Sequence, residues 1–221
     1  ILTEHIVRQN RYASVLDVGC GTGHFLDYLA ESHPTLKLTG IDPSTIPDIQ
    51  GVEMVNEDFL AWDPVGTFDV IVSLHVIEHI EDVHAFVRAI VKLCRPGGSV
   101  IVSTINDRSI LYMAARLLRR IGLPQPFVRL YGTHHLHHFT TASLRWLLES
   151  EGLAVQRAQT RNLPMASVDT GTDSLIADGL YRLGVGACFA LGAFSGRSYQ
   201  QILFCRAPGG VSPATVGGER D

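Results

Sequence analysis

Short, almost entirely apolar segments alternate with segments of helical periodicity in this chain, and that alternation limits the possible folds more than any other feature. The expected strands are 15–18, 37–41, 52–56, 68–74 and 99–104, and the expected helices between them include 24–32 and 82–94. A strand such as FDVIVSL (68–74) has no polar face, as is typical of a central parallel strand covered on both sides. The repeated strand–helix–strand order predicts an α/β fold with a doubly wound, mostly parallel sheet.

The second half of the chain has a looser pattern. Helices are expected at 109–121, 141–150 and 174–193, and two further strands at 154–160 and 199–206 would complete a seven-stranded sheet. We therefore expect one domain over 1–206, with helical insertions after strand 5 and between strands 6 and 7. Segments 109–140 and 160–198 would form insertions or a cap on the side of the domain where a substrate (the acceptor) would bind. The Gly- and Pro-rich tail 207–221 would be disordered.

Composition excludes several classes of protein. Hydrophobic residues make up 46% and charged residues 18%, which suits a folded core, and a formal net charge of -4 gives no general affinity for nucleic acid. The four cysteines are widely spaced and form no CxxC pair, which favours a reducing cytoplasm over a disulfide or zinc framework. The apolar run 183–194 would span roughly 18 Å as a helix, too short for a membrane span.

A glycine-rich turn follows the first expected strand. The segment VLDVGCGTG (15–23) places Asp17 near the carboxyl end of the strand, followed by glycines that let the backbone approach a ligand before a helix begins. That helix would offer free N–H groups to a carboxylate. A dinucleotide fingerprint needs a third glycine at position 24, where this chain has His24, so an NAD-dependent oxidoreductase is disfavoured.

Acidic residues follow the next two expected strands. Asp42 ends the second strand, where a carboxylate can accept hydrogen bonds from both ribose hydroxyls, and Asp58-Phe59 follows the third, offering an acceptor and a ring to an adenine. Each aspartate alone could simply cap a turn. Together with Asp17 and the glycine turn at the first strand, these residues provide suitable groups at three strand ends and predict a nucleoside-binding site.

These motifs resemble, in order, those of class I S-adenosylmethionine methyltransferases. The resemblance covers residues 13–105 and rests on VLDVGCGTG, LTGIDPS, EDF, FDVIVSLHVIEHI and LCRPGGSVIVST. A looser similarity, through STIN (103–106) and GTHHLHHFTTASLRWLLESEGL (132–153), resembles the ubiquinone-biosynthesis O-methyltransferases and related small-molecule enzymes. The resemblance to class I enzymes implies a Rossmann-like methyltransferase fold, S-adenosylmethionine as cofactor and S-adenosylhomocysteine as product. Residues 160–198 show no such similarity.

The resemblance also implies which residues contact the cofactor. The expected contacts are Asp17, Gly19, Cys20, Gly21, Gly23, Asp42, Pro43, Asp58, Phe59, Leu74 and His75. Asp42 and Asp58 would bind the nucleoside, and the turn 19–23 would receive the methionine end.

Two histidine clusters are candidates for deprotonating a hydroxyl acceptor: the first is within residues 75–79 and the second within residues 134–138. His79 follows the fourth strand, and His134 and His135 precede the helix at 141, so these three are the candidate catalytic residues. Residues 75–79 also match HxxEH, a zinc-peptidase signature, which we reject because His75 leaves a strand and not a long helix. Glu78 and His79 could instead brace the following helix. A divalent ion held by Glu78, His79 and a carboxylate is left open, but a metal site is not favoured in either cluster.

The sequence therefore predicts methyl transfer to a small-molecule acceptor, most plausibly an aromatic, lipid-like or secondary-metabolite hydroxyl. Small-molecule N-methylation and cofactor binding without turnover are the alternatives. The helix 109–121, with its arginines, could lie on a membrane or over the acceptor pocket, but we favour a packed helix with a solvated basic face. Segment 174–194 could serve as a lid or as a homodimer contact.

Overall fold

The computed structural model describes residues 2–10, 12–44, 47–132, 135–168 and 174–209. Seven strands form one sheet in the order β3-β2-β1-β4-β5-β7-β6. The strands are β1 (Ser14–Val18), β2 (Lys37–Ile41), β3 (Val52–Val55), β4 (Phe68–Leu74), β5 (Cys94–Ile105), β6 (Ala154–Arg161) and β7 (Gln200–Arg206). β1 to β5 run parallel to one another, and β7 is antiparallel to both β5 and β6. The expected mostly parallel, seven-stranded sheet is confirmed.

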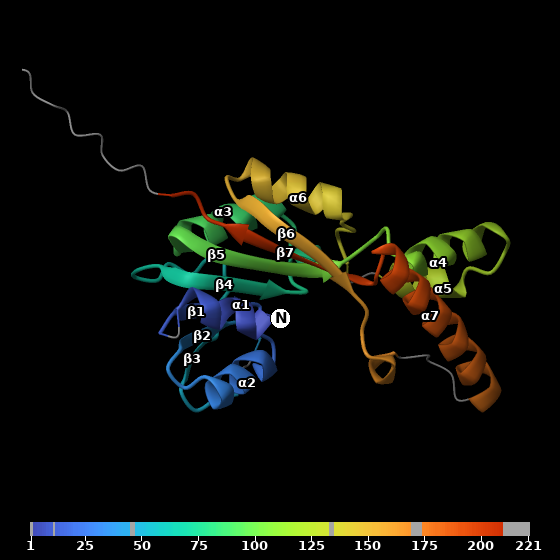
Figure 1. The fold of residues 1–221 in the computed structure, drawn as a ribbon, viewed down its shortest axis with the longest axis horizontal. Coiled ribbons are helices and arrows are strands. Elements are labelled where there is room, and N and C mark those ends of the chain that lie inside the picture. The colour runs from blue at the N-terminus through green and yellow to red at the C-terminus, as the bar shows by residue number, and fades with distance from the viewer. Residues whose placement is uncertain (1, 11, 45–46, 133–134, 169–173, 210–221) are drawn as a thin grey trace, which may run out of the picture.

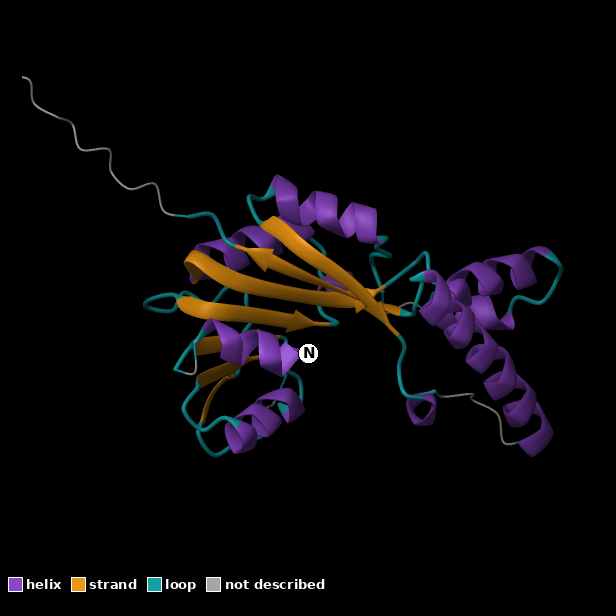
Figure 2. Cartoon of the chain, in the orientation of Figure 1, coloured by secondary structure: helices purple, strands orange, loops and turns teal. Residues whose placement is uncertain are grey.

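Helices cover both faces of this sheet (Figures 1 and 2). The helices are α1 (Leu2–Gln9), α2 (His24–Ser32), α3 (Val83–Leu93), α4 (Ile110–Arg120), α5 (Gln125–Leu130), α6 (Thr141–Ser150) and α7 (Leu175–Ser195), with short 3-10 turns η1 (Ile77–His79) and η2 (Met165–Ser167). α1 and α2 lie on one side and α3 and α6 on the other, as a doubly wound topology requires. No helix within the described ranges combines the length and apolarity needed to cross a membrane.

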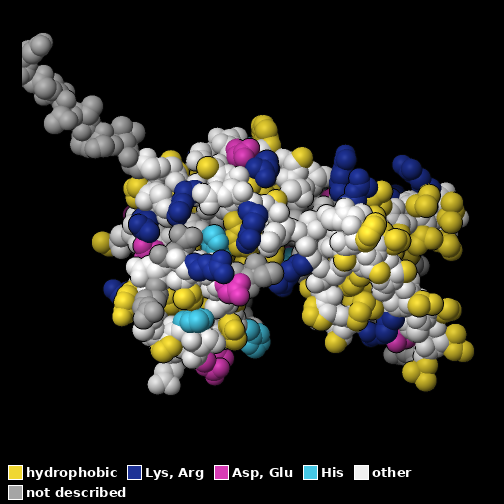
Figure 3. All heavy atoms as spheres, viewed as in Figure 1, with side chains coloured by type: hydrophobic (Ala, Val, Ile, Leu, Met, Phe, Trp, Pro, Cys, Tyr) yellow, Lys and Arg dark blue, Asp and Glu magenta, His cyan; other side chains and the backbone are white. Residues whose placement is uncertain are grey.

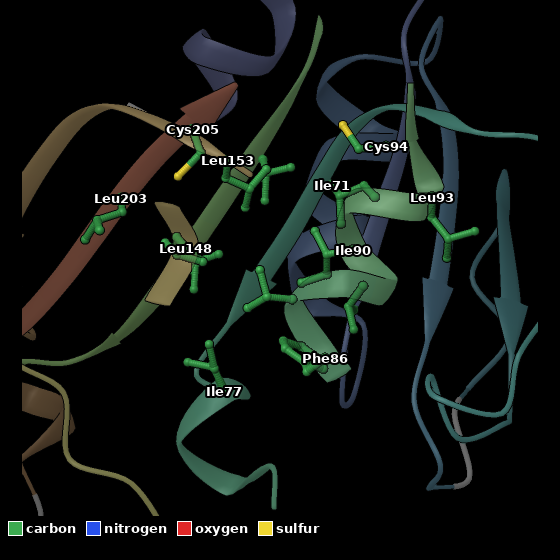
Figure 4. Close-up of a cluster of buried hydrophobic side chains, with 14 of the residues drawn as sticks. Ile71, Ile77, Phe86, Ile90, Leu93, Cys94, Leu148, Leu153, Leu203 and Cys205 are labelled. Atoms are coloured by element: carbon green, nitrogen blue, oxygen red, sulfur yellow. The ribbon is translucent and has the colours of Figure 1, made fainter. Parts of the chain in front are cut away.

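Two hydrophobic cores lie on the two faces of the sheet. Alternate residues of β4 divide between them: Ile71 joins the core under α3 and α6, and Val70 and Val72 join the core under α1 and α2. Figure 4 shows Phe86 and Ile90 of α3 in the first of these cores, on the same face as Ile71. This period of two is the pattern of a strand buried on both faces, which is why the sequence of β4 has no polar side.

Some expected boundaries were wrong. Cys94, expected to end the helix at 82–94, is the first residue of β5, which begins five residues before the expected 99. The periodicity gave no sign of α1 or α5. The tail was expected to be disordered from residue 207, but Ala207 is buried and donates its N–H to Gly98 O at 2.9 Å, so the chain stays attached to the sheet there. Residues 210–221 lie outside the described residues.

α4, α5 and α7 form a helical lobe beyond the carboxyl ends of the parallel strands (Figure 1). α4 packs against both α5 and α7, and Tyr112 of α4 donates its hydroxyl hydrogen to Leu130 O of α5 at 2.8 Å. Asp107 accepts hydrogen bonds from Arg116, at 2.9 Å, and from Tyr131. The two insertions expected from the sequence therefore meet at the end of the sheet where ligands bind in such folds.

Candidate active site

A cleft of about 570 Å³ opens at the carboxyl ends of β1, β2 and β4. Its volume is in the usual range for small-molecule sites, about 300–1,000 Å³. Seven of the residues expected in the site line it: Gly19, Asp42, Pro43, Asp58, Phe59, His75 and His79. The sequence reasoning did not name the other lining residues, which include Val76, Glu81 and Asp82. Their position directly after the fourth strand was the available signal.

The glycine turn is fixed by the neighbouring strand. Gly19 and Cys20 donate their N–H groups to Ile41 O at 2.8 and 3.1 Å, and Gly21 donates to Asp42 Oδ2 at 2.9 Å. Gly19 has φ +71°, and a Cβ there would lie 2.4 Å from Val76 Cγ2. The turn therefore requires glycine at this position both for its conformation and for the room beside Val76.

Asp42 is held in place by the turn that it stabilises. Its Oδ1 accepts hydrogen bonds from the hydroxyl and the N–H of Ser44, the latter at 2.9 Å. Partial burial raises the pKa of Asp42, but hydrogen bonds from Ser44 and Gly21 outweigh burial, so the pKa lies below its usual value. Asp42 is therefore an oriented, ionised carboxylate at the cleft. Asp58 also faces it, while accepting the N–H of Leu60 at 2.7 Å.

Asp17 lies beneath the cleft and does not line it. Its side chain is only 3% exposed, and its Oδ1 atom has no hydrogen-bond partner within the described part of the chain. Burial, and then the charge of Asp42, raise the pKa of Asp17 to about 7. Cys20, Gly21, Gly23 and Leu74 also support the cleft from outside its lining, so only some of the expected contacts face the ligand space directly.

The cleft carries an unusual charge for a nucleotide site. Asp42, Asp58, Glu81 and Asp82 line it, and none of the described lining residues is lysine or arginine. Asp82 also caps α3 by accepting the N–H of Ala85 at 2.8 Å. Such a site attracts a cationic ligand and repels a diphosphate, which agrees with the absence of a third glycine from the turn.

These residues fit S-adenosylmethionine, the cofactor that the sequence resemblance implies. The cleft combines acidic groups with the glycine cradle beside Val76, and the ring of Phe59 lies at its wall. Phe59 packs edge-on against Phe86 with ring centroids 5.4 Å apart, so the wall is rigid and apolar. Carboxylates for a cationic amino acid and apolar rings for an adenine are the chemistry that this ligand requires.

Glu78 organises the histidines beside the cleft. Its side chain is 1% exposed, and its Oε1 lies 3.2 Å from His75 Nδ1. Burial raises the pKa of Glu78, but hydrogen bonds from His75 and Thr104 outweigh it, so the pKa is lowered. The carbonyl oxygen of Glu78 accepts the N–H groups of Leu136 and His137 at 2.8 and 3.1 Å. This ties the second histidine cluster to the first. Asp82, and not Glu78, caps the following helix.

His79 and His135 are brought together by this tie, with ring centroids 5.0 Å apart. One ligand atom from each of Glu78, His79 and His135 lies within 4.8 Å of the others, an arrangement able to hold a divalent ion. His134, the third candidate catalytic residue, lies outside the described residues. The structure thus joins two clusters that are more than 50 residues apart in the sequence.

A second cavity of about 350 Å³ lies among α4, α5, α7 and the segment that follows β6. Its lining includes Leu111, Leu163, Val185, Phe189 and Tyr199. A series of neighbouring rings connects the two regions: His79, His135, His138, Tyr131, Tyr112 and Tyr199. Tyr199 directly precedes Gln200, whose Nε2 lies 2.8 Å from His75 Nε2.

Comparisons with known proteins indicate the family of this chain. A sequence profile described as a methyltransferase domain matches residues 3–158. A ubiquinone biosynthesis O-methyltransferase of Paracidovorax citrulli is 36% identical over 115 residues, covering 46% of this chain and 47% of that protein. One from Xanthomonas oryzae pv. oryzae is 30% identical over 158 residues, covering 63% and 62%. The chain thus spans about half to three fifths of the length of these relatives.

Solved structures share the fold. The 1,6-didemethyltoxoflavin-N1-methyltransferase of Burkholderia thailandensis, with S-adenosylhomocysteine bound, gives a TM-score of 0.59 at 16% identity, covering 94% of this chain and 77% of that one. An N-methyltransferase of Bradyrhizobium japonicum, also bound to S-adenosylhomocysteine, gives 0.53 at 18% identity, covering 94% and 86%. The profile match spans well over half of the sequence, and on that evidence this chain belongs to the methyltransferase domain family.

Proposed function

We propose that this chain binds S-adenosylmethionine in the acidic cleft and transfers its methyl group to a hydroxyl of a small molecule. The observation that carries the proposal is the lining of the cleft, which has four carboxylates and no lysine or arginine among its described members. When bound, S-adenosylmethionine supplies an electrophilic methyl group on a positively charged sulfur. We treat residues 1–206 as one domain for this purpose, because strands from both ends of that range share one sheet.

Each part of the cleft has a role in this proposal. Asp42 accepts hydrogen bonds from the ribose, and Asp58 and Phe59 bind the adenine. The Gly19–Gly23 turn receives the amino-acid end, with Asp17 buried beneath it. Holding the acceptor oxygen in line with the departing sulfur supplies several kcal/mol of the barrier reduction.

Proton removal is assigned to the histidine pair. His79 lines the cleft, and His135 stands next to it, so an acceptor hydroxyl at this position would lie beside an imidazole that can take its proton. Glu78 supports this region through its backbone carbonyl, which accepts from Leu136 and His137, and through its buried side chain, which lies 3.2 Å from His75 Nδ1.

The acceptor class is proposed from the second cavity. Its lining is mainly leucine, valine and aromatic side chains, with Arg129 and Ser167 as the other members, and suits an aromatic or lipid-like body. The histidines of the neighbouring cleft suit a hydroxyl at the end of that body. The names of the O-methyltransferase relatives support a hydroxyl acceptor at modest identity. Transfer to nitrogen is the alternative, since a neutral amine needs no base.

The proposal is tested by measuring S-adenosylhomocysteine formation with a panel of phenols, catechols and matching amines. His79→Gln should lower kcat by about 100-fold or more, because general base catalysis contributes about 10²–10⁴-fold. Its cofactor Kd by calorimetry should be unchanged. His33→Gln, which alters a histidine at the end of α2, is the matched control.

The outcomes separate the alternatives. Cofactor binding with no product from any acceptor would leave a binding protein without turnover, and turnover restricted to amines would assign N-methylation. Activity that is lost on chelation and restored by Mg²⁺ or Mn²⁺ would make Glu78, His79 and His135 metal ligands instead of a base and its support.

A further inference from the structure

α7 is apolar on two opposite faces. Its inner face places Val185 and Phe189 against the lobe, where both are buried. Its outer face carries an apolar stripe at intervals of three, four and eight residues, and these side chains point to solvent: Ile176, Leu180, Leu183, Leu191 and Phe194. Leu180 is 67% and Phe194 94% exposed. A helix that is apolar on opposite faces is normally buried on both, and the outer face of α7 has no partner among the described residues.

The neighbouring helices extend this surface. Around the end of α4 and in α5, four more large apolar side chains are more than half exposed: Leu117, Ile121, Leu123 and Val128. α4 packs beside α7, so the exposed groups belong to one lobe. Figure 3 shows hydrophobic side chains gathered over this lobe, with lysine or arginine side chains at its upper edge. Monomeric proteins rarely expose so much contiguous apolar surface without a binding role.

The lobe is also strongly basic, in contrast to the rest of the chain. Segments 107–132 and 174–199 contain seven arginines, two aspartates and no lysine or glutamate, while the whole chain has a formal net charge of -4. Both aspartates are paired within the lobe, Asp107 with Arg116 at 2.9 Å and Asp178 with Arg182 at 2.9 Å. The remaining arginines, including the exposed Arg119 and Arg120, give the lobe its surplus positive charge.

We propose that the helical lobe docks on a membrane surface that contains anionic lipids, with α7 lying in the plane of the interface. Apolar side chains would enter the boundary between headgroups and acyl chains, and the arginines would pair with lipid phosphates. A second copy of the lobe is a poorer occupant, because it would bring two positively charged surfaces together. The proposal does not depend on methyl transfer, since docking requires no acceptor.

The test is flotation of the purified chain with vesicles of phosphatidylcholine alone and of phosphatidylcholine with 30% phosphatidylglycerol (about one lipid in three). Binding should require the anionic lipid and weaken at high salt. The double variant Leu180→Ser/Leu183→Ser should bind at least about tenfold more weakly. Val65→Ser with Tyr28→Ser, two exposed apolar residues outside the lobe, is the matched control and should bind as the parent does.

Two variants that each lose one positive charge test the electrostatic part of the proposal. Arg120→Gln should weaken binding about fivefold, whereas Lys37→Gln, which removes an exposed charge at the start of β2, should leave it unchanged. Thermal unfolding of each variant confirms that it is folded. Equal binding to both kinds of vesicle, or none to either, would overturn the proposal. A concentration-dependent dimer lost in Leu180→Ser/Leu183→Ser, without vesicle binding, would assign the face to a second copy of the chain.

Discussion

The side chains of His75 and Gln200 meet between β4 and β7, with their Nε2 atoms 2.8 Å apart. The other ring nitrogen of His75 lies 3.2 Å from Glu78 Oε1. Because an amide nitrogen can only donate, His75 Nε2 accepts from Gln200, which leaves the ring proton on Nδ1, facing the carboxylate. An antiparallel strand from the end of the chain thus fixes the orientation of a residue at the cleft.

Removing the amide donor should loosen the His75 ring without unfolding the protein. We expect Gln200→Met to lower the free energy of unfolding by about 1–3 kcal/mol, because it removes the hydrogen bond donated to His75 and the one accepted from Arg161 at 3.2 Å, each contributing about 0.5–1.5 kcal/mol. Catalytic turnover should fall more than cofactor affinity, because the backbone of the cleft is unchanged. Urea denaturation, calorimetry and kcat measure these effects. Gln156→Met, at an exposed glutamine of β6, should change none of them, and equal effects of the two variants would contradict the assigned role.

His75 also adopts a left-handed backbone conformation, with φ +59°, and it is the only described residue other than glycine to do so. This conformation costs a residue with a Cβ about 1–2 kcal/mol. We therefore expect His75→Gly to be more stable than His75→Ala by about that amount, since both lose the ring equally. At Lys37, an exposed residue of β2 in regular register with β1, alanine should be the more stable of the two. If urea denaturation showed the same one of the two replacements, glycine or alanine, to be the more stable at both positions, the strain at His75 would be refuted.

The approach of Gly19 to Val76 gives a separate test of the glycine turn. Gly19→Ala adds a methyl group where Val76 Cγ2 would be 2.4 Å away, and the left-handed φ adds strain of about 1–2 kcal/mol. Cofactor affinity should fall at least tenfold, or about 1.4 kcal/mol. Gly122→Ala has a similar positive φ but open space around it, so it should lose stability without losing affinity. Val76→Ala should partly restore binding to Gly19→Ala, and no restoration would count against the contact.

Asp42 should contribute to cofactor binding more than to stability. Asp42→Ala removes an ionised acceptor at the cleft, so we expect calorimetry to detect no cofactor binding at concentrations that saturate the parent protein. Hydrogen bonds to charged groups contribute about 1.5–3 kcal/mol each, so two of them account for at least a hundredfold loss. Asp63→Ala removes an exposed carboxylate paired with Lys92 and should bind normally. Unchanged affinity in Asp42→Ala would show that Asp42 only caps the turn.

Asp17 should make stability depend on pH. Burial and the charge of Asp42 raise its folded pKa to about 7, above the unfolded value of about 3.9. The folded chain therefore binds the proton of Asp17 more tightly than the unfolded chain does. The resulting contribution to the free energy of unfolding is complete below about pH 4. It is lost as the pH rises to about 7, by up to about 4 kcal/mol. Asp17→Asn should gain stability over the parent across this window in cofactor-free urea denaturation. If the free energy of unfolding changed with pH in the same way in the parent and in Asp17→Asn, the effect would be excluded. The exposed Asp63, whose pKa Lys92 lowers, should show no such gain when replaced by Asn.

Much of the fold could be read from local patterns. β4 and α3 carry strong periodicities that arise from burial on two faces or on one, and these survive without knowledge of the partners. α5 and α1 were missed because they are short, and α5 begins with two prolines within three residues. The boundary at Cys94 was misplaced because a buried cysteine fits the inner face of a helix and a central strand equally well.

The sequence by itself determined most of the strands, the glycine turn and the positions of Asp42, Asp58 and His79 after strand ends, because each depends on residues close together in the chain. Only the tertiary structure decided that Asp17 lies beneath the cleft, that Gln200 orients His75, and that His135 stands beside His79. It also decided that α7 leaves an apolar face uncovered. These relationships join residues up to 125 positions apart. Distances of that kind are set by packing of the whole sheet, which no local pattern of residues encodes.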